Sequence, residues 1–111
     1  MKDKQKIENI IKSGEVVVFM KGTPDFPQCG FSANVIGILN YFNIKFTSFN
    51  VLEDNLIREG IKNYSNWPTI PQIYIKEEFV GGCDIFRELA ENGEIEDLFQ
   101  KHDIKYQVKE N

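Results

Sequence analysis

The feature that most constrains the fold of this chain is an uninterrupted apolar run, EVVVFM, at residues 15–20. Because the run is rich in β-branched side chains and does not alternate with polar ones, it predicts a strand covered on both faces. Apolar residues at helical spacing lie on either side of the run and supply that cover. They are Ile7, Ile10 and Ile11 before it, and Phe31, Val35, Ile38, Leu39 and Phe42 after it. A doubly covered strand between two amphipathic helices indicates an α/β protein.

Strand and helix patterns continue to alternate in the middle of the chain. Residues 45–51 predict a second strand, and Asp54 or Asn55 would cap the helix that follows it. We expect that helix to bury a stripe made of Ile57, Ile61 and Tyr64.

A hairpin and two short helices are predicted for the last third of the chain. Residues 72–76 and 79–80 form the hairpin, which turns at Glu77-Glu78, and residues 85–91 form a helix before a last amphipathic segment. The order α-β-α-β-α-β-β-α-α predicts one domain over residues 1–111, with a frayed tail at 105–111. Its architecture would be a four-stranded mixed sheet flanked by about five helices.

Composition excludes several classes of protein. Thirteen Lys and Arg against seventeen Asp and Glu give a net charge of −4, which argues against a nucleic-acid partner. No apolar run approaches the ~20 residues that a membrane span needs. The polar first six residues carry no apolar signal core, so we expect a reducing compartment.

The two cysteines, Cys29 and Cys83, further limit the possible chemistry. They are too few for the disulfide framework of a small secreted protein, and too far apart for a CxxC pair or a zinc ribbon. In a reducing compartment each is therefore a buried structural thiol, a reactive thiol or a metal ligand.

The neighbours of Cys29 favour a reactive or metal-ligating thiol. Cys29 lies between a proline-containing loop at residues 22–28 and a predicted helix, whose free N–H groups and dipole stabilise a thiolate. Lys21 adds a positive charge on the same side, and Gly30 leaves room for a bulky group at the sulfur. Ser32 stands where a dithiol motif has its second cysteine, so thiol exchange would need an external thiol, most plausibly glutathione.

Four short motifs occur together around these residues. They are Lys21-Gly22-Thr23-Pro24, Cys29-Gly30-Phe31-Ser32, Trp67-Pro68-Thr69-Ile70-Pro71-Gln72 and Gly81-Gly82-Cys83-Asp84. In their order and spacing they resemble the CGFS-type monothiol glutaredoxins, over about residues 8–101. The resemblance implies a single glutaredoxin domain with a thioredoxin-like fold, which agrees with the predicted element order. It also implies a [2Fe–2S] cluster held between two chains, each of which supplies its CGFS cysteine and one bound glutathione.

The resemblance further implies roles for residues near the thiol. Cys29 would be the cluster ligand and the candidate catalytic thiol, and Lys21 would contact glutathione. Arg58 would meet the glycyl carboxylate of glutathione, with Lys62 as the weaker candidate, since both lie on one helical face. The alternative for both cations is an ordinary solvated helix face.

The two later motifs would complete the glutathione site. Pro71 would be a cis-proline that turns the backbone of Ile70 outward to pair with the cysteinyl unit of glutathione, and Thr69 would flank that surface. Gly82 would let the backbone approach the ligand, and the N–H groups of Cys83 and Asp84 would hold the γ-glutamyl carboxylate.

Alternatives remain for individual side chains. Asp84 either takes the γ-glutamyl ammonium or caps its own helix, and Cys83 is either a spectator thiol, our default, or a disulfide partner of Cys29. We expect Trp67 to be a core aromatic that closes a helix end, and His102 to be solvated.

The function implied by the resemblance is [2Fe–2S] cluster binding and transfer in iron–sulfur protein maturation. The carrier would act as a homodimer or with a BolA-like partner and would deliver to apo iron–sulfur proteins, in a bacterial cytoplasm or a mitochondrial matrix. The alternative is a glutathione-dependent oxidoreductase that removes glutathione through Cys29; the proline-stiffened loop at 22–28 favours the carrier, with at most weak activity of this kind. A third possibility, an interaction module without a cofactor, is disfavoured by the presence of Lys21, Cys29 and Asp84.

Overall fold

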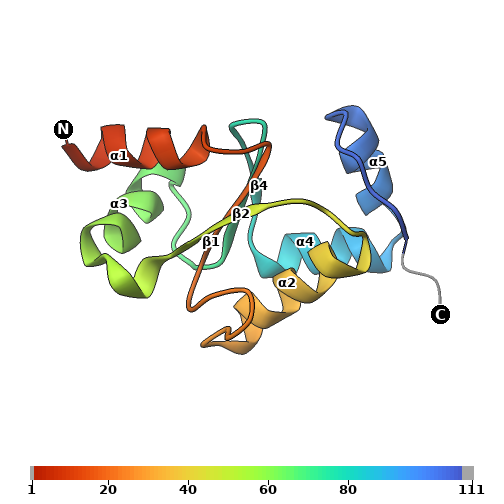
Figure 1. Cartoon of the computed structure of the whole chain (residues 1–111), viewed down its shortest axis with the longest axis horizontal. Helices are drawn as coiled ribbons and strands as arrows, with labels where there is room; N and C mark the ends of the chain where they lie inside the picture. Colours follow the sequence, from red (N-terminus) through yellow and green to blue (C-terminus); the bar gives the residue numbers. More distant parts are fainter. Residues whose placement is uncertain (1, 109–111) are drawn as a thin grey trace.

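The computed structural model describes residues 2–108 (Figure 1). It contains one mixed sheet with the strand order β2-β1-β3-β4. The central strand β1 (Val16–Met20) runs parallel to β2 (Thr47–Asn50) and antiparallel to β3 (Gln72–Ile75). The edge strand β4 (Glu78–Gly81) pairs antiparallel with β3. The predicted four-stranded mixed sheet is therefore confirmed.

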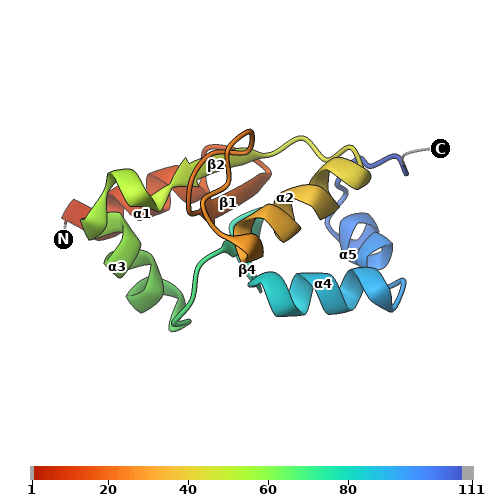
Figure 2. The same ribbon diagram turned by 90° about the horizontal axis from the view of Figure 1, so that it is seen from below.

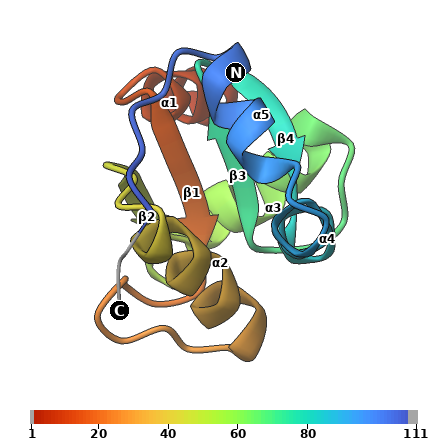
Figure 3. The same cartoon turned by 90° about the vertical axis from the view of Figure 1, so that its right-hand side faces the viewer.

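Helices cover both faces of this sheet, as the buried run in β1 requires. One face carries α1 (Lys2–Ile11) and α3 (Asn55–Ser65), and the other carries α2 (Gly30–Tyr41), α4 (Cys83–Glu91) and α5 (Ile95–Lys101) (Figures 1 and 2). Seen from the side on which α5 lies, that helix crosses in front of the sheet (Figure 3). None of the helices within residues 2–108 is both long and apolar enough to cross a membrane.

The side chains of β1 alternate between the two halves of the core. Val17 and Phe19 pack with residues of α1 and α3, whereas Val16, Val18 and Met20 pack with residues of α2, α4 and α5. All five are almost completely inaccessible to solvent. Because successive side chains of a strand point to opposite faces, a strand with no polar position needs both layers of helices.

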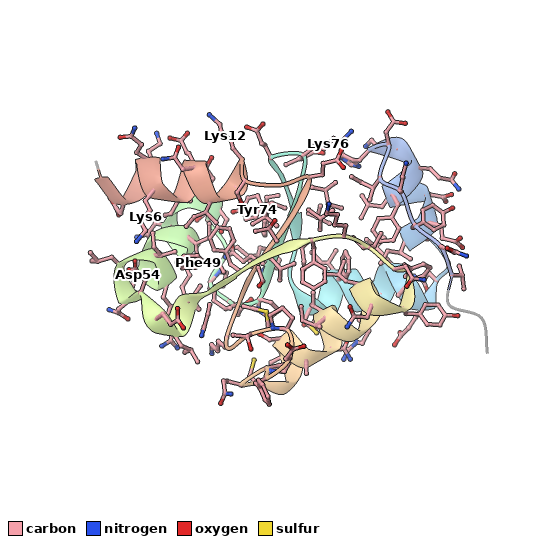
Figure 4. The ribbon with its side chains drawn as sticks, viewed as in Figure 1. Lys6, Lys12, Phe49, Asp54, Tyr74 and Lys76 are labelled. Carbon is pink, nitrogen blue, oxygen red and sulfur yellow. The ribbon has the colours of Figure 1, made fainter. Side chains whose placement is uncertain are left out.

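An ion pair between Lys6 and Asp54 joins α1 to α3. Asp54 is the N-cap of α3, as predicted, and its Oδ1 accepts a hydrogen bond from the Ile57 N–H at 3.1 Å. Its other oxygen lies 2.6 Å from Nζ of Lys6 on α1, and the two labelled side chains face each other in Figure 4. The hydrogen bond from Lys6 holds the pKa of Asp54 below its usual value, with help from the Ile57 N–H.

Three local predictions were wrong. Phe31 is 60% exposed, because it lies in the first turn of α2, outside the buried stripe. Tyr64 is exposed at the end of α3, where it lines a hollow against α1 instead of the core. The hairpin turns at Lys76-Glu77, one residue earlier than predicted, and both residues have positive φ. A short 3-10 helix between β2 and α3, η1 (Val51–Glu53), was not predicted.

The prediction that His102 is solvated was also wrong. Its Nε2 lies 2.7 Å from Oε2 of Glu78 at the start of β4, and its Nδ1 lies 3.0 Å from the Leu98 carbonyl oxygen. Part of the expected frayed tail is held in place as well. The Gln107 N–H donates to the Phe42 carbonyl at 2.9 Å, while residues 109–111 lie outside the described residues.

Candidate functional site

Cys29 begins helix α2 as its N-cap, at the end of the loop that follows β1. Its sulfur accepts a hydrogen bond from the Ser32 N–H at 3.4 Å and lies 3.3 Å from the Ser32 hydroxyl oxygen. The thiol is partly exposed, whereas the Ser32 side chain is fully buried. The sulfur thus takes the capping position that an oxygen of Ser or Asp takes in most helices.

The surroundings of Cys29 favour its thiolate form. Burial by itself raises the pKa of the thiol, but the Ser32 hydroxyl, the Ser32 N–H and the charge of Lys21 outweigh it and lower the pKa below its usual value. The Phe31 N–H adds to the same effect. Since the thiolate is both the nucleophile and the metal ligand, Cys29 is prepared for either chemistry.

Cys83 differs from Cys29 in both exposure and acidity. It is buried in the first turn of α4, and burial raises the pKa of its thiol, partly offset by the charge of Arg87. Both cysteines are free. The geometry therefore agrees with Cys83 as a spectator thiol.

The loop before Cys29 is fixed at both of its ends. The Gln28 N–H donates to the Lys21 carbonyl at 2.8 Å, and the Gly22 N–H donates to Oδ1 of Asn50 at 2.9 Å. Gly22 has a φ of +93°, and a Cβ there would lie 2.5 Å from the Phe26 carbonyl oxygen, so a larger residue does not fit. Asn50 holds the loop against the end of β2, a contact that the sequence did not reveal.

The segment from Trp67 to Pro71 leads from the end of α3 into β3. Its Ile70–Pro71 peptide bond is cis, as the resemblance implied. Trp67 is not a simple core aromatic: it is only partly buried, and its indole nitrogen lacks a hydrogen-bond partner among the described residues. That nitrogen lies 3.2 Å from the place a Cβ would take at Gly82, so the indole edge packs on the glycine backbone.

The N-terminus of α4 completes the candidate site. Gly82 is the N-cap and provides no capping side chain, so the first N–H groups of the helix are open to a ligand. The alternative role of Asp84 as the cap was wrong: its carboxylate is exposed and lies 3.3 Å from Nη2 of Arg87. Gly82 was expected to let its backbone approach a ligand closely. In the structure its backbone approaches the Pro71 carbonyl and the Trp67 indole of this chain closely.

Two adjoining hollows join these segments into one surface. The first, about 110 Å³, is lined by the Trp67 segment and by the start of α4; the second, about 220 Å³, is lined by the same segment and by two lysines. Both share Phe31, Thr69 and Ile70, so they form a continuous surface, here called the thiol-side groove. Its lining residues are Lys21, Phe31, Lys62, Trp67, Pro68, Thr69, Ile70, Pro71, Gly82, Cys83 and Asp84. Larger hollows between α1 and α3 and between α2 and α4 share no residue with it.

The predicted cations occupy different places. Lys21 and Lys62 both line the groove, although Lys62 was the weaker candidate. Arg58, one helical turn earlier on α3, does not line the groove, and its Nε is buried without a hydrogen-bond partner in the described part of the chain. Its assignment to glutathione stays a prediction.

Within residues 2–108, no three His, Cys, Asp or Glu side chains gather as a group that fits a metal ion.

Two polar residues at this site were missed by sequence reasoning. From the sequence, Ser32 was considered only as the replacement of a second cysteine, yet its hydroxyl accepts a hydrogen bond from the Lys21 N–H at 3.1 Å. Gln72 is completely buried and donates hydrogen bonds to the Trp67 segment. The available signal was a single amide at the head of the otherwise apolar strand QIYI.

Comparisons of the sequence with known proteins all find glutaredoxins. The sequence profile of the Glutaredoxin family matches residues 16–80. A mitochondrial monothiol glutaredoxin of Lachancea kluyveri is 53% identical over 103 residues, or 90% of this chain and 72% of that protein. A monothiol glutaredoxin of Synechocystis sp. is 54% identical over 97 residues, or 87% of this chain and 91% of that protein.

A solved structure extends the likeness to the fold. The solution structure of a monomeric truncated mutant of Trypanosoma brucei 1-C-Grx1 is 40% identical, with a TM-score of 0.84, and the match covers 96% of both chains. The predicted thioredoxin-like arrangement of a four-stranded sheet and five helices is therefore confirmed.

Proposed function

This chain belongs to the glutaredoxin family and, within it, to the monothiol glutaredoxins; on that premise we propose that it binds glutathione and carries a [2Fe–2S] cluster as cargo through Cys29. The observation that carries the proposal is the contrast between the two thiols. Cys29 is partly exposed at a helix N-terminus with a lowered pKa, whereas Cys83 is buried with a raised one. Only Cys29 thus offers a thiolate to an external partner.

The thiol-side groove has the chemistry that glutathione requires. Glutathione carries two carboxylates and one ammonium group, and Lys21 and Lys62 supply positive charge at one end of the groove. The N–H groups at the start of α4, which no side chain caps, would hold the γ-glutamyl carboxylate at the other end, and the exposed Asp84 would meet the ammonium. Between the two ends, Ile70 lines both hollows and would pair through its backbone with the cysteinyl unit.

The stoichiometry of a bound cluster follows from the thiol count. A [2Fe–2S] cluster with four thiolate ligands needs more than one chain provides, because each chain has a single poised thiolate. Two chains and two glutathione thiols complete the set. Cluster binding would then require both glutathione and dimerisation, and release to an apo iron–sulfur protein would return two monomers.

The alternative function is removal of glutathione from protein mixed disulfides. The thiolate of Cys29 supports it, but the residue in the place of a resolving cysteine is a buried serine. We therefore assign this chain at most a weak oxidoreductase activity. The mitochondrial relative supports a mitochondrial matrix as the proposed site of action, and the bacterial relative supports a bacterial cytoplasm. A BolA-like protein, implied by the motif resemblance alone, is a second proposed partner.

Anaerobic reconstitution tests the proposal. The protein is mixed with ferrous iron, sulfide and reduced glutathione, then followed by visible absorption and gel filtration. We expect a coloured dimer, and a colourless monomer when glutathione is omitted. A protein that stays colourless and monomeric with glutathione, yet turns over a glutathione mixed disulfide rapidly, would overturn the carrier function in favour of the oxidoreductase.

Two matched variants locate the ligand. Cys29→Ser should abolish the cluster, because it removes the only poised thiolate. Cys83→Ser should retain most of it, since that thiol is buried. Loss of the colour in both variants would show that Cys83 is no spectator.

A further inference from the structure

Gln72 is a fully buried polar side chain at the start of β3, beside the thiol-side groove. Its Nε2 donates to the carbonyl oxygen of Trp67 at 3.1 Å and to that of Thr69 at 3.2 Å. Its Oε1 accepts a hydrogen bond from the Tyr74 hydroxyl at 3.3 Å. Both N–H bonds of the amide and one lone pair of its oxygen are thus matched by complementary groups.

The Trp67–Pro71 segment depends on Gln72 because few other hydrogen bonds hold its backbone. The Trp67 N–H donates to the Lys62 carbonyl at 3.1 Å, and prolines 68 and 71 have no N–H to donate. Among the described residues, the N–H groups of Thr69 and Ile70 have no hydrogen-bond partner. The two carbonyl bonds from Gln72 are therefore the main polar contacts that orient this segment.

The orientation of one peptide unit follows directly. The Thr69–Ile70 peptide bond is trans, so its C=O and its N–H point in opposite directions. Gln72 draws the Thr69 carbonyl inward, toward the buried side of β3. The Ile70 N–H is consequently directed away from Gln72, and Ile70 lines both hollows.

We infer that Gln72 is a positioning residue, which presents the Ile70 N–H as a donor to the backbone carbonyl of the cysteinyl unit of bound glutathione. The inference rests on the proposed function and adds to it a residue that touches no ligand. A buried donor group aimed at two carbonyls costs free energy if it loses them, so the orientation is maintained in the absence of ligand.

Tyr74 holds the far side of the Gln72 amide and provides a matched control. Its side chain lies inside the molecule between α1 and the sheet (Figure 4), where burial raises its pKa to about 12 and keeps the hydroxyl protonated as a donor. Tyr74→Phe removes this hydroxyl, which also interacts with Ser65, and leaves both carbonyl bonds of Gln72 in place. Gln72→Met has a similar shape but removes all three hydrogen bonds.

The experiment is a titration with reduced glutathione followed by nitrogen–proton correlation spectra of the wild type, Gln72→Met and Tyr74→Phe. In the wild type we expect the Ile70 amide to shift downfield, along with those of Cys83 and Asp84. In Gln72→Met the affinity should fall about threefold to tenfold, the worth of one hydrogen bond. The Ile70 shift at saturation should shrink while the Cys83 and Asp84 shifts persist. Tyr74→Phe should stay within about twofold of the wild type.

The outcomes separate this inference from the function beneath it. If Gln72→Met binds glutathione with unchanged affinity and an unchanged Ile70 shift, the positioning role is overturned and glutathione binding stands. If the wild type shows no shift with glutathione, the proposed binding fails and the inference falls with it.

A measurement on the wild type alone decides the matter if Gln72→Met does not fold. The two side-chain amide protons of Gln72 should exchange slowly with solvent, while the Ile70 N–H should exchange rapidly until glutathione protects it. Rapid exchange of the Gln72 amide protons, or an Ile70 N–H already protected in the free protein, would overturn the inference.

Discussion

The sulfur of Cys29 and the hydroxyl oxygen of Ser32 lie 3.3 Å apart, and the same hydroxyl accepts a hydrogen bond from the Lys21 N–H at 3.1 Å. A short polar chain thus connects the end of β1 to the first turn of α2. When Cys29 is a thiolate, the buried hydroxyl donates a hydrogen bond to the sulfur. The residue that replaces a resolving cysteine therefore stabilises the thiolate instead of exchanging with it.

Replacing Ser32 by Ala should raise the pKa of Cys29, because the burial that raises it then acts against fewer stabilising donors. The measurement is the rate of alkylation as a function of pH, made in a Cys83→Ser background so that only Cys29 reacts. The midpoint should move to higher pH, with Ser13→Ala as the control on an exposed serine. An unchanged or lower midpoint would contradict the role given to Ser32.

Gly82→Ala should separate the Trp67–Pro71 segment from α4. A Cβ at Gly82 would lie 3.1 Å from the Pro71 carbonyl oxygen and 3.2 Å from Nε1 of Trp67, so one of them must move. We expect a loss of about 1 to 3 kcal/mol in denaturant unfolding, together with weaker glutathione binding. Gly37→Ala is the matched control, since a Cβ there meets nothing within 4 Å and should stabilise the helix by about 0.5 to 1 kcal/mol. Equal stability of the two variants would show that the contact at Gly82 is not tight.

Removal of the groove cations should weaken glutathione binding. Lys21→Gln and Lys62→Gln should each raise the dissociation constant about tenfold and reduce its dependence on salt. The fluorescence of Trp67, the single tryptophan, reports the titration because Trp67 lines the groove. Arg58→Gln is measured beside them. A large effect at Arg58 with none at Lys62 would return the carboxylate contact to the residue that the sequence favoured.

The His102–Glu78 pair should make stability depend on pH. Both ring nitrogens of His102 face acceptors, the Leu98 carbonyl and the Glu78 carboxylate, so only the imidazolium satisfies both. The hydrogen bond to Glu78 raises the pKa of His102, and the same contact lowers that of Glu78. A raised histidine pKa gives stability that is present below the ordinary value of 6.5 and is lost as the pH rises through the folded value. A lowered carboxylate pKa gives stability that is present above 4.5 and is lost as the pH falls through the folded value.

The melting temperature of His102→Gln should consequently fall below that of the wild type most at about pH 6, and the difference should narrow by about pH 8.5. Lys12→Gln, at an exposed charge directly after α1, is the control (Figure 4). A difference that grows with rising pH would contradict the assignment of a charged His102.

Periodicity alone predicted the layers of this fold, because they follow from burial. The run in β1 and the stripes of α2 and α3 each require a particular partner surface. The wrong predictions concern residues whose position in the fold is not determined by burial in the core. Phe31 and Tyr64 fit a helical stripe by spacing, but they lie in the end turns of their helices and are exposed. The pairing of His102 with Glu78 joins residues that are distant in sequence, so no local pattern reveals it.

The parts of the candidate site that lie in short sequence motifs could be predicted from the sequence. The placement of Cys29 at a helix N-terminus followed from the loop and stripe on either side of it. The contacts of Ser32 and Gln72 did not, because a buried hydroxyl or amide is recognised only when its partners are known. Likewise, the choice between Arg58 and Lys62 depends on the rotation of α3 about its axis, which charge spacing on one face leaves open.

Native mass spectrometry of the anaerobically reconstituted protein tests the central claim most directly, because it counts every component of the complex at once. We predict an assembly of two chains, one [2Fe–2S] cluster and two glutathione molecules, lost together in Cys29→Ser. Iron bound to a single chain, or a dimer that carries a cluster without glutathione, would contradict the account.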